Sequence, residues 1–314
     1  MADTLTTTTE VDPAVSVFYD RVLLKAAHPK LVHGKFAQHA RLAKKSGNTY
    51  KWRRYSNLSD ATTPLPEGIN PPGQKMAKTD LTAQVSWYGD FVHITDVIDL
   101  TVEDPVLTIA ADKLGKQEGK TFDTLMRDIL SACASKTNAS GGTNAQTPTE
   151  LTRGDVDAVV KTLLGSNAEM IQSMVRAGSG VGTSPVRAAF WSIIHTDIMD
   201  DLEAVTGFKA VSEYPRQNDV DDAEWGATGN CRWLYTTNAK KTTESPVQYH
   251  LPIIGQDAYG DVDLSSSKNI VKAFGSSGIA DPLDRQATSG WKTVWVARIL
   301  NDSFMHILEV TAGT

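Results

Sequence analysis

Several side chains that could bind a metal ion lie close together near the middle of the chain. His195 and Asp197 are two residues apart, and Asp200 and Asp201 follow within one helical turn. Divalent cations prefer oxygen and imidazole ligands, but this spacing matches no known metal-binding loop. Asp197 also fits the first turn of a helix, where the helix dipole stabilises a carboxylate. The pattern therefore favours a helix start over a metal site.

Other candidates for catalysis carry even less signal. Asp90, Asp96 and Asp99 resemble a carboxylate pair for acid–base chemistry, but nothing beside them in the sequence would raise one pKa and not the other. The glycine-rich run 177–185 (AGSGVGTSP) lacks the Lys-Ser/Thr ending of a phosphate-binding loop. The sequence also contains no GxSxG or HExxH motif. We therefore predict a protein that is not an enzyme and uses no cofactor or metal.

The run Lys51-Trp52-Arg53-Arg54-Tyr55 combines basic and aromatic side chains. Such a strand can stack on the bases of a single-stranded nucleic acid. It is also typical of an edge strand protected by charges, whose Lys and Arg would meet carboxylates on another chain. We favour the edge strand, because the segment that follows carries Asp90 and Asp96 rather than more basic residues.

The distribution of charge is uneven. The net charge is −6, yet residues 21–59 hold ten Lys or Arg and no Asp or Glu. Residues 197–224 hold nine acidic residues against Lys209 and Arg216, a balance of −7. A basic stripe of this kind indicates a nucleic acid or an acidic protein surface as its partner.

One long helix is predicted over 103–137, and the other elements must be arranged around it. Thr101 and Asp104 are start signals, and Pro105 suits the first helical position. Apolar residues then recur every three or four positions as far as Cys133. Gly115 and Gly119, one turn apart, leave either a bare face for a close neighbour or a tolerated weakness. A helix of this length would span roughly 50 Å.

Two arms are predicted ahead of the long helix. Residues 1–14 form an acidic tail, and 15–43 read as one helix, or as two helices broken at Pro29, with an apolar stripe thin enough to lie on a partner. Strands are predicted at 48–57 and 81–96, joined by a loop rich in Pro and Gly. A two-stranded ribbon is not stable alone in water, so this arm needs a partner.

The remaining pattern predicts an α+β chain. Amphipathic or buried segments follow the long helix, namely a helix at 151–165, a strand at 188–195, a short helix begun by Thr196, a strand pair at 224–236, and strands at 247–254, 268–274, 291–300 and 304–311. Cys133 and Cys231 lack metal-site spacing and are expected to be reduced core residues. No run of 18 apolar residues suggests a membrane span.

Ordered motifs along the chain resemble one known protein family. They are KFAQ (35–38), TYKWRRY (49–55), ATTPLPEGINPPG (61–73), YGDFVHITD (88–96), DPVL (104–107), GQDAYG (255–260), GSSGIADPLDRQ (275–286) and GWK…RILND (290–302). The family is that of the major capsid proteins of Enquatrovirus-like tailed phages. The motifs are long and keep their order, whereas residues 138–225 match more loosely.

This resemblance implies the Hong Kong 97-type capsid fold, an α+β fold. It divides the chain into an N-terminal arm (1–46), an extended strand–loop–strand arm or E-loop (47–96), a peripheral domain with its spine helix (97–150), an axial domain (151–251) and return strands that complete the peripheral domain (252–314). In that fold both arms reach over neighbouring subunits. Because the first arm begins within the first twenty residues, we expect no large scaffolding segment ahead of it.

The resemblance also implies a structural protein of the virion: copies assemble in the host bacterial cytoplasm into hexamers and pentamers of an icosahedral head around double-stranded DNA. The partners implied are other copies, the packaged DNA, scaffolding and portal proteins, and a decoration protein. Two alternatives remain open, a same-fold cargo compartment like an encapsulin and a nucleic-acid-binding module. The candidates for subunit or DNA contact are Arg21, Lys35, Lys51, Trp52, Arg53, Arg54, Tyr55, Pro64, Glu67, Gly68 and Asp90.

Overall fold

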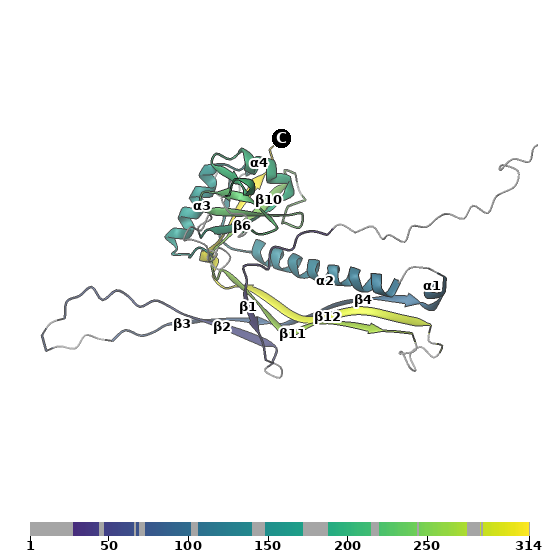
Figure 1. Ribbon diagram of the computed structural model, residues 1–314. Coiled ribbons are helices and arrows are strands. Elements are labelled where there is room, and N and C mark those ends of the chain that lie inside the picture. The colour runs from purple at the N-terminus through teal and green to yellow at the C-terminus, as the bar shows by residue number, and fades with distance from the viewer. Residues whose placement is uncertain are drawn as a thin grey trace, which may run out of the picture.

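The computed structural model describes residues 28–43, 47–65, 67–68, 73–101, 106–139, 148–171, 188–214, 220–243, 245–274, 283 and 285–313. The predicted acidic tail, Arg21, the predicted helix start at 103–105 and the glycine-rich run 177–185 lie outside these residues. The described chain is α+β and has three parts: a long helix on an elongated sheet, a compact lobe, and a projecting hairpin (Figure 1).

The elongated sheet has four strands in the order β1 (Gln38–Arg41), β11 (Tyr259–Lys272), β12 (Gln286–Ile299) and β4 (Ser86–Thr95). β1 pairs parallel with β11, and the other pairs are antiparallel. The long helix α2 (Val106–Ser131) lies along one face of this sheet, with the short helix α1 (Asp96–Thr101) at the far end (Figure 1). Phe122 of α2 makes edge contacts with the rings of Trp291 and Trp295.

The long helix ends earlier than its sequence pattern predicts. It stops at Ser131 rather than at residue 137, and its 26 described residues span about 39 Å. The chain leaves the helix because residues 136–138 form β5 (Lys136–Asn138), which pairs parallel with β13 (Met305–Thr311). Ile307 donates its backbone N–H to the carbonyl of Ser135, and Ala139 donates to that of Glu309. Hydrogen bonds to a distant strand therefore replace the last predicted turns.

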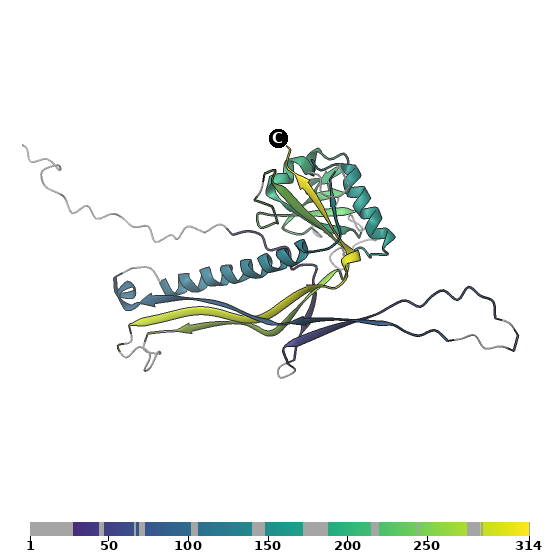
Figure 2. The same ribbon diagram turned by 180° about the vertical axis from the view of Figure 1, so that it is seen from behind.

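The compact lobe is built on a seven-stranded sheet. Its order is β5, β13, β10 (Gln248–Ile254), β6 (Phe190–His195), β9 (Cys231–Thr236), β8 (Glu224–Thr228) and β7 (Phe208–Ala210). The lobe also holds α3 (Arg153–Gly165), which begins with a capping box between Thr152 and Asp155, and α4 (Met199–Ala204) (Figure 2). Three short 3-10 helices complete the described elements: η1 (Thr196–Ile198), η2 (Val211–Glu213) and η4 (Asp302–Phe304). The helix at 151–165 and the strand pair at 224–236 are confirmed.

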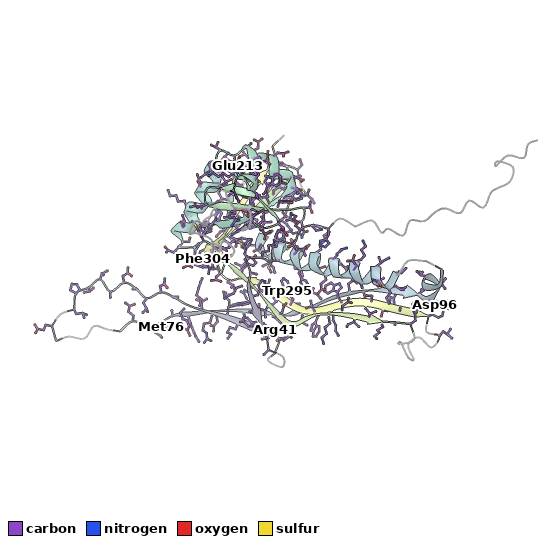
Figure 3. The ribbon with its side chains drawn as sticks, in the orientation of Figure 1. Arg41, Met76, Asp96, Glu213, Trp295 and Phe304 are labelled. Carbon is purple, nitrogen blue, oxygen red and sulfur yellow. The ribbon has the colours of Figure 1, made fainter. Side chains whose placement is uncertain are left out.

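The two strands predicted at 291–300 and 304–311 are present as β12 and β13, but they belong to different sheets. Figure 3 labels Trp295 in the four-stranded sheet and Phe304 where the chain passes into the lobe. The buried side chains form two hydrophobic cores. One lies around α2 between the two sheets and includes Trp191 of β6 and Trp295 of β12, and the other lies in the lobe around α3, Phe190 and Trp233. Both cysteines are free and buried, as predicted.

The hairpin consists of β2 (Thr49–Tyr55) and β3 (Lys78–Gln84), paired antiparallel. The single strand predicted over 81–96 is wrong, because the chain breaks at the buried Val85 and continues as β4. Most hairpin residues are exposed, and the ribbon points away from the sheet, in the direction opposite to α1 (Figure 1, Figure 2).

The helix predicted after Pro29 is also wrong. Residues 28–36 form an extended segment and a turn that cross α2, and β1 follows. We call residues 28–36 the strap. Val32 and Phe36 are buried against the core around α2, which explains the thin apolar pattern. The strap is held by side chains of other elements, because Asp123 accepts hydrogen bonds from its backbone while Tyr259 and Thr236 donate to it, and local periodicity cannot reveal such distant partners.

Candidate functional site

Two basic residues of the hairpin, Lys51 and Arg53, are paired within the chain. Nε of Arg53 lies 2.8 Å from Oδ1 of Asp80 on the opposite strand, and Nζ of Lys51 lies 3.7 Å from Oδ2. The hydrogen bond from Arg53 lowers the pKa of Asp80 below its ordinary value. The sequence analysis placed the carboxylate partner on another chain, whereas Asp80 lies on the return strand of the same chain. The register of β2 and β3, rather than the composition of the strand, places Asp80 opposite Arg53.

The other hairpin candidates lie at the surface and do not form one cluster. Tyr55 is exposed, and Trp52 is half-buried with its ring edge-on to Tyr50 at 4.8 Å. Arg54 is exposed and borders a surface hollow of about 600 Å³ that is also lined by residues 297–303. The loop residues are all exposed, namely Pro64, Glu67 and Gly68.

Asp90 lies far from these residues and faces α2. Its Oδ2 accepts a hydrogen bond of 2.6 Å from Nε2 of Gln117, and its Oδ1 accepts from the N–H of Phe91. The hydrogen bond from Gln117, followed by that from Phe91, lowers the pKa of Asp90 below its ordinary value. Asp90 therefore joins sheet to helix, and Asp96 does not approach it as an acid–base partner would; it lies beside Arg285.

The basic segment reaches the acidic segment inside one chain. Nζ of Lys35 lies 2.5 Å from Oδ1 of Asp221, and Lys30 donates to the carbonyl of Asp222. The ammonium of Lys30 also lies over the ring of Tyr235, 4.4 Å from its centre. The domain division implied by the resemblance makes such direct contact doubtful. It forms because the strap runs past the lobe before it crosses α2.

A buried polar cluster beneath the strap was missed by the sequence analysis. Oδ1 of Asp123 on α2 accepts the backbone N–H groups of Val32 and His33, both at 2.9 Å. Its Oδ2 lies 2.9 Å from Nδ1 of His33 and accepts a 2.7 Å bond from Nδ2 of Asn238 in the lobe. Burial raises the pKa of Asp123, but the hydrogen bonds from His33 and Asn238 outweigh it, so that this pKa lies below its ordinary value.

The Asp123 cluster joins three parts of the molecule that are distant in sequence. Tyr259 adds a bond of 2.5 Å from its hydroxyl to the carbonyl of His33, and Thr236 donates to the carbonyl of Lys30. One signal was available in the sequence. Asp123 interrupts the buried row Leu114, Met126 and Leu130 at helical spacing, and a buried carboxylate needs partners. The residues near Asp123 in the sequence do not show which side chains these partners are.

The candidate metal ligands are used for structure. Nδ1 of His195 accepts the N–H of Asp197 at 3.1 Å and so caps the short helix η1, a place that the sequence assigned to Thr196. The carboxylate of Asp197 accepts bonds from Nζ of Lys241 and the hydroxyl of Tyr249. Burial lowers the pKa of His195. Within the described ranges, no three His, Cys, Asp or Glu side chains gather as metal ligands.

Comparison with solved structures identifies the fold. The capsid of Ralstonia phage GP4 matches with a TM-score of 0.72 over 99% of both chains, at 11% identity. The cyanophage Pam1 capsid matches with 0.67 over 99% of both chains, at 14% identity. The head of Helicobacter pylori bacteriophage KHP40 matches with 0.66 over 98% of this chain and 97% of that one, at 10% identity. The chain has the fold of phage capsid proteins.

Sequence comparison adds no closer relative. No protein-family profile matches the chain, and no curated protein does. In the part of the chain that the structure describes, no helix has both the length and the hydrophobicity for a membrane crossing.

Proposed function

We propose that this protein is the major capsid protein of a tailed double-stranded DNA phage, a structural subunit with the Hong Kong 97-type fold. The observation that supports this most is the structural match with phage capsids over 99% of both chains. The resemblance to the Enquatrovirus-like family belongs to the same proposal.

The architecture fits a subunit that is completed by its neighbours. The hairpin carries few buried residues, and a two-stranded ribbon gains stability by packing on something else. In the assembled head, we propose that residues 47–96 reach a neighbouring copy and that the lobe, within 151–251, lines the centre of hexamers and pentamers. Many weak contacts of this kind give a stable shell, because each subunit is held by several others.

The basic residues divide into two groups in this proposal. Lys30, Lys35, Lys51 and Arg53 have partners within their own chain, so they organise the subunit. Arg54 makes no ion pair among the described residues and is the better probe of an external partner. We expect Arg54→Glu to reduce assembly if the side chain meets a neighbour. Normal empty shells that retain DNA poorly would instead place it against packaged DNA.

Electron microscopy of the purified protein at assembly concentration tests the main proposal. The DNA, scaffolding and portal partners are left out of this experiment. We expect the protein alone to form closed icosahedral particles. A monomer that forms no particles and binds oligonucleotides would contradict the proposal and support a nucleic-acid-binding module. Particles isolated from cells with an enzyme inside and no genome would support the cargo compartment.

A further inference from the structure

A cavity of about 400 Å³ lies between the strap, α2 and the four-stranded sheet. Leu31 lines it from the strap and Phe122 from α2. Trp295 lines it from β12, and Figure 3 labels this residue in the sheet beneath α2. Cavities of this volume hold small organic molecules. A molecule bound here would contact segments of the chain that are distant in the sequence.

Two glycines shape the space. A Cβ on Gly34 of the strap would meet nothing within 4 Å, so a larger side chain at this position would enter the cavity without a clash. Gly119 on α2 faces the opposite situation, because a Cβ there would lie 2.8 Å from Cδ1 of Leu31. Leu31 itself is 40% exposed, so it stands between the cavity and solvent.

The walls of the cavity are mainly apolar and aromatic. The rings of Phe122 and Trp295 meet edge to face, with their centres 5.3 Å apart, and Met126 adds apolar surface from the next turn of α2. Such walls favour an apolar or aromatic ligand. The faces of aromatic rings also attract cations.

The charges of the lining are unequal. Its titratable side chains are Lys35, His39, Asp123 and Asp261. One lysine therefore stands against two carboxylates. Nζ of Lys35 already lies 2.5 Å from Oδ1 of Asp221 in the lobe. Asp123 is buried and is contacted by donors of the strap and the lobe. The partners of these two side chains lie within the subunit.

Asp261 is the other carboxylate, and among the described residues no Lys or Arg pairs with it. Its Oδ1 lies 2.6 Å from Nδ1 of His39, and its Oδ2 accepts a hydrogen bond of 3.3 Å from Nε1 of Trp295. Both partners are uncharged whenever His39 is neutral. The side chain of Asp261 is only 13% exposed. A carboxylate that is largely removed from water and lacks a cation favours a positively charged partner.

We propose that this cavity binds a small organic cation, namely a primary amine carried on an apolar or aromatic body. The ammonium donates to the carboxylate of Asp261, and the body packs against Phe122 and Trp295. Charge complementarity favours a cation, because an anion would be placed beside Asp261. Every residue of the site belongs to one subunit, so the inference does not depend on the proposed assembly.

Three probes that share a phenyl body test the charge. They are phenethylamine, phenethyl alcohol and phenylacetate, which are positive, neutral and negative at pH 7. Isothermal titration calorimetry on the purified full chain compares their affinities. We expect the amine to bind about tenfold or more tightly than the alcohol, as a hydrogen bond to a charged group allows. Phenylacetate should show no binding. Equal affinity for the amine and the alcohol would overturn the inference.

Two variants test the role of Asp261. Asp261→Asn keeps the shape of the side chain and removes its charge, so the preference for the amine over the alcohol should disappear. His39→Lys, at an exposed position, places a permanent cation beside Asp261 and should have the same effect. Asp112→Asn, an exposed change on α2, is the matched control and should keep the preference. A preference that survives in both variants would contradict the assigned contact.

Filling the cavity locates the ligand. Gly34→Leu should weaken binding of both the amine and the alcohol at least tenfold, because its side chain takes their place. Gly115→Leu makes the same change on α2 where a Cβ also meets nothing within 4 Å, and it should bind as the wild type does. In the wild type, saturating amine should slow hydrogen exchange in the strap relative to α3, because the ligand stabilises the closed strap. Undiminished binding to Gly34→Leu, with no change in strap exchange, would place the amine elsewhere on the protein and overturn the inference.

Discussion

At the scale of single residues, Asp123 has more structural consequence than any of the residues selected from the sequence. It holds two strap amides, His33 and Asn238 at once. Its burial makes these bonds obligatory, because an unpaired buried carboxylate is strongly unfavourable. The strap, the long helix and the lobe are therefore linked through one side chain.

Because the pKa of Asp123 is lowered in the folded protein, the stability of this link depends on pH. A carboxyl whose pKa is lower in the folded state stabilises the fold above its unfolded pKa of about 3.9. The stabilisation is lost as the pH falls through the folded value. We expect hydrogen exchange at Val32 and His33 to speed up, relative to amides of α3, as the pH falls below about 4.

The variant Asp123→Asn tests the same link at neutral pH. It keeps the shape of the side chain but removes the charge and replaces one of the two acceptor oxygens by a donor NH2 group, which must then face a donor, either Nδ2 of Asn238 or the strap amides. We expect faster exchange at Val32 and His33 already at pH 7. Asp112→Asn, an exposed change on the same helix, serves as the control. Equal protection of the strap in wild type and Asp123→Asn would contradict the assigned role.

The two glycines of the long helix turn out to differ. A Cβ on Gly119 would lie 2.8 Å from Cδ1 of Leu31 in the strap, whereas a Cβ on Gly115 would meet nothing within 4 Å. What approaches the bare face is thus a side chain of the same subunit. We expect Gly119→Leu to displace Leu31, expose the strap to protease and reduce assembly.

The variant Gly115→Leu is the internal control, since it gains about 1 kcal/mol of helix propensity without touching the strap. Its strap should resist protease as in the wild type. If both variants behave alike, then Leu31 does not need the space above Gly119.

At the scale of elements, local sequence patterns correctly predicted the helices and strands that depend mainly on neighbouring residues. The helix predicted at 151–165, the strand pair at 224–236 and the buried strand at 188–195 all follow from patterns of neighbouring residues, and all were found. The predictions that failed were those that needed a distant partner. The end of α2 depends on β13, and the strap depends on Asp123 and Tyr259. The pairing of Arg53 with Asp80 depends on hairpin register.

The direction of the hairpin has its own anchor. Arg298 on β12 donates from its guanidinium to the carbonyl of Thr82 on β3. We expect Arg298→Ala to loosen the ribbon, seen as faster exchange over residues 49–55 and 78–84, while α2 stays protected. Arg153→Ala, which removes an exposed ion pair in the lobe, is the control. Unchanged exchange in the ribbon would show that packing of Ala83 and Val85 holds it without Arg298.

At the scale of the whole molecule, two cores are tied together at three crossings. The chain passes from α2 to β5, from β10 to β11, and from β12 through η4 to β13. The strap adds a fourth tie that is polar rather than covalent. The core around α2 contains side chains of the lobe sheet, such as Trp191 and Leu234, together with Trp295 of the four-stranded sheet. A change in the angle between the lobe and the four-stranded sheet would therefore have to repack this core as well as break the strap contacts.

The position of β12 and β13 in the chain has a consequence for synthesis. β12 lies between β11 and β4 in its sheet, and β13 lies between β5 and β10 in the other. Neither sheet can close until residues 286–311 have left the ribosome. Contacts between such distant segments form slowly, so a nascent chain cannot offer a finished four-stranded sheet or a finished lobe to its neighbours. Completion of translation thereby becomes a checkpoint ahead of assembly.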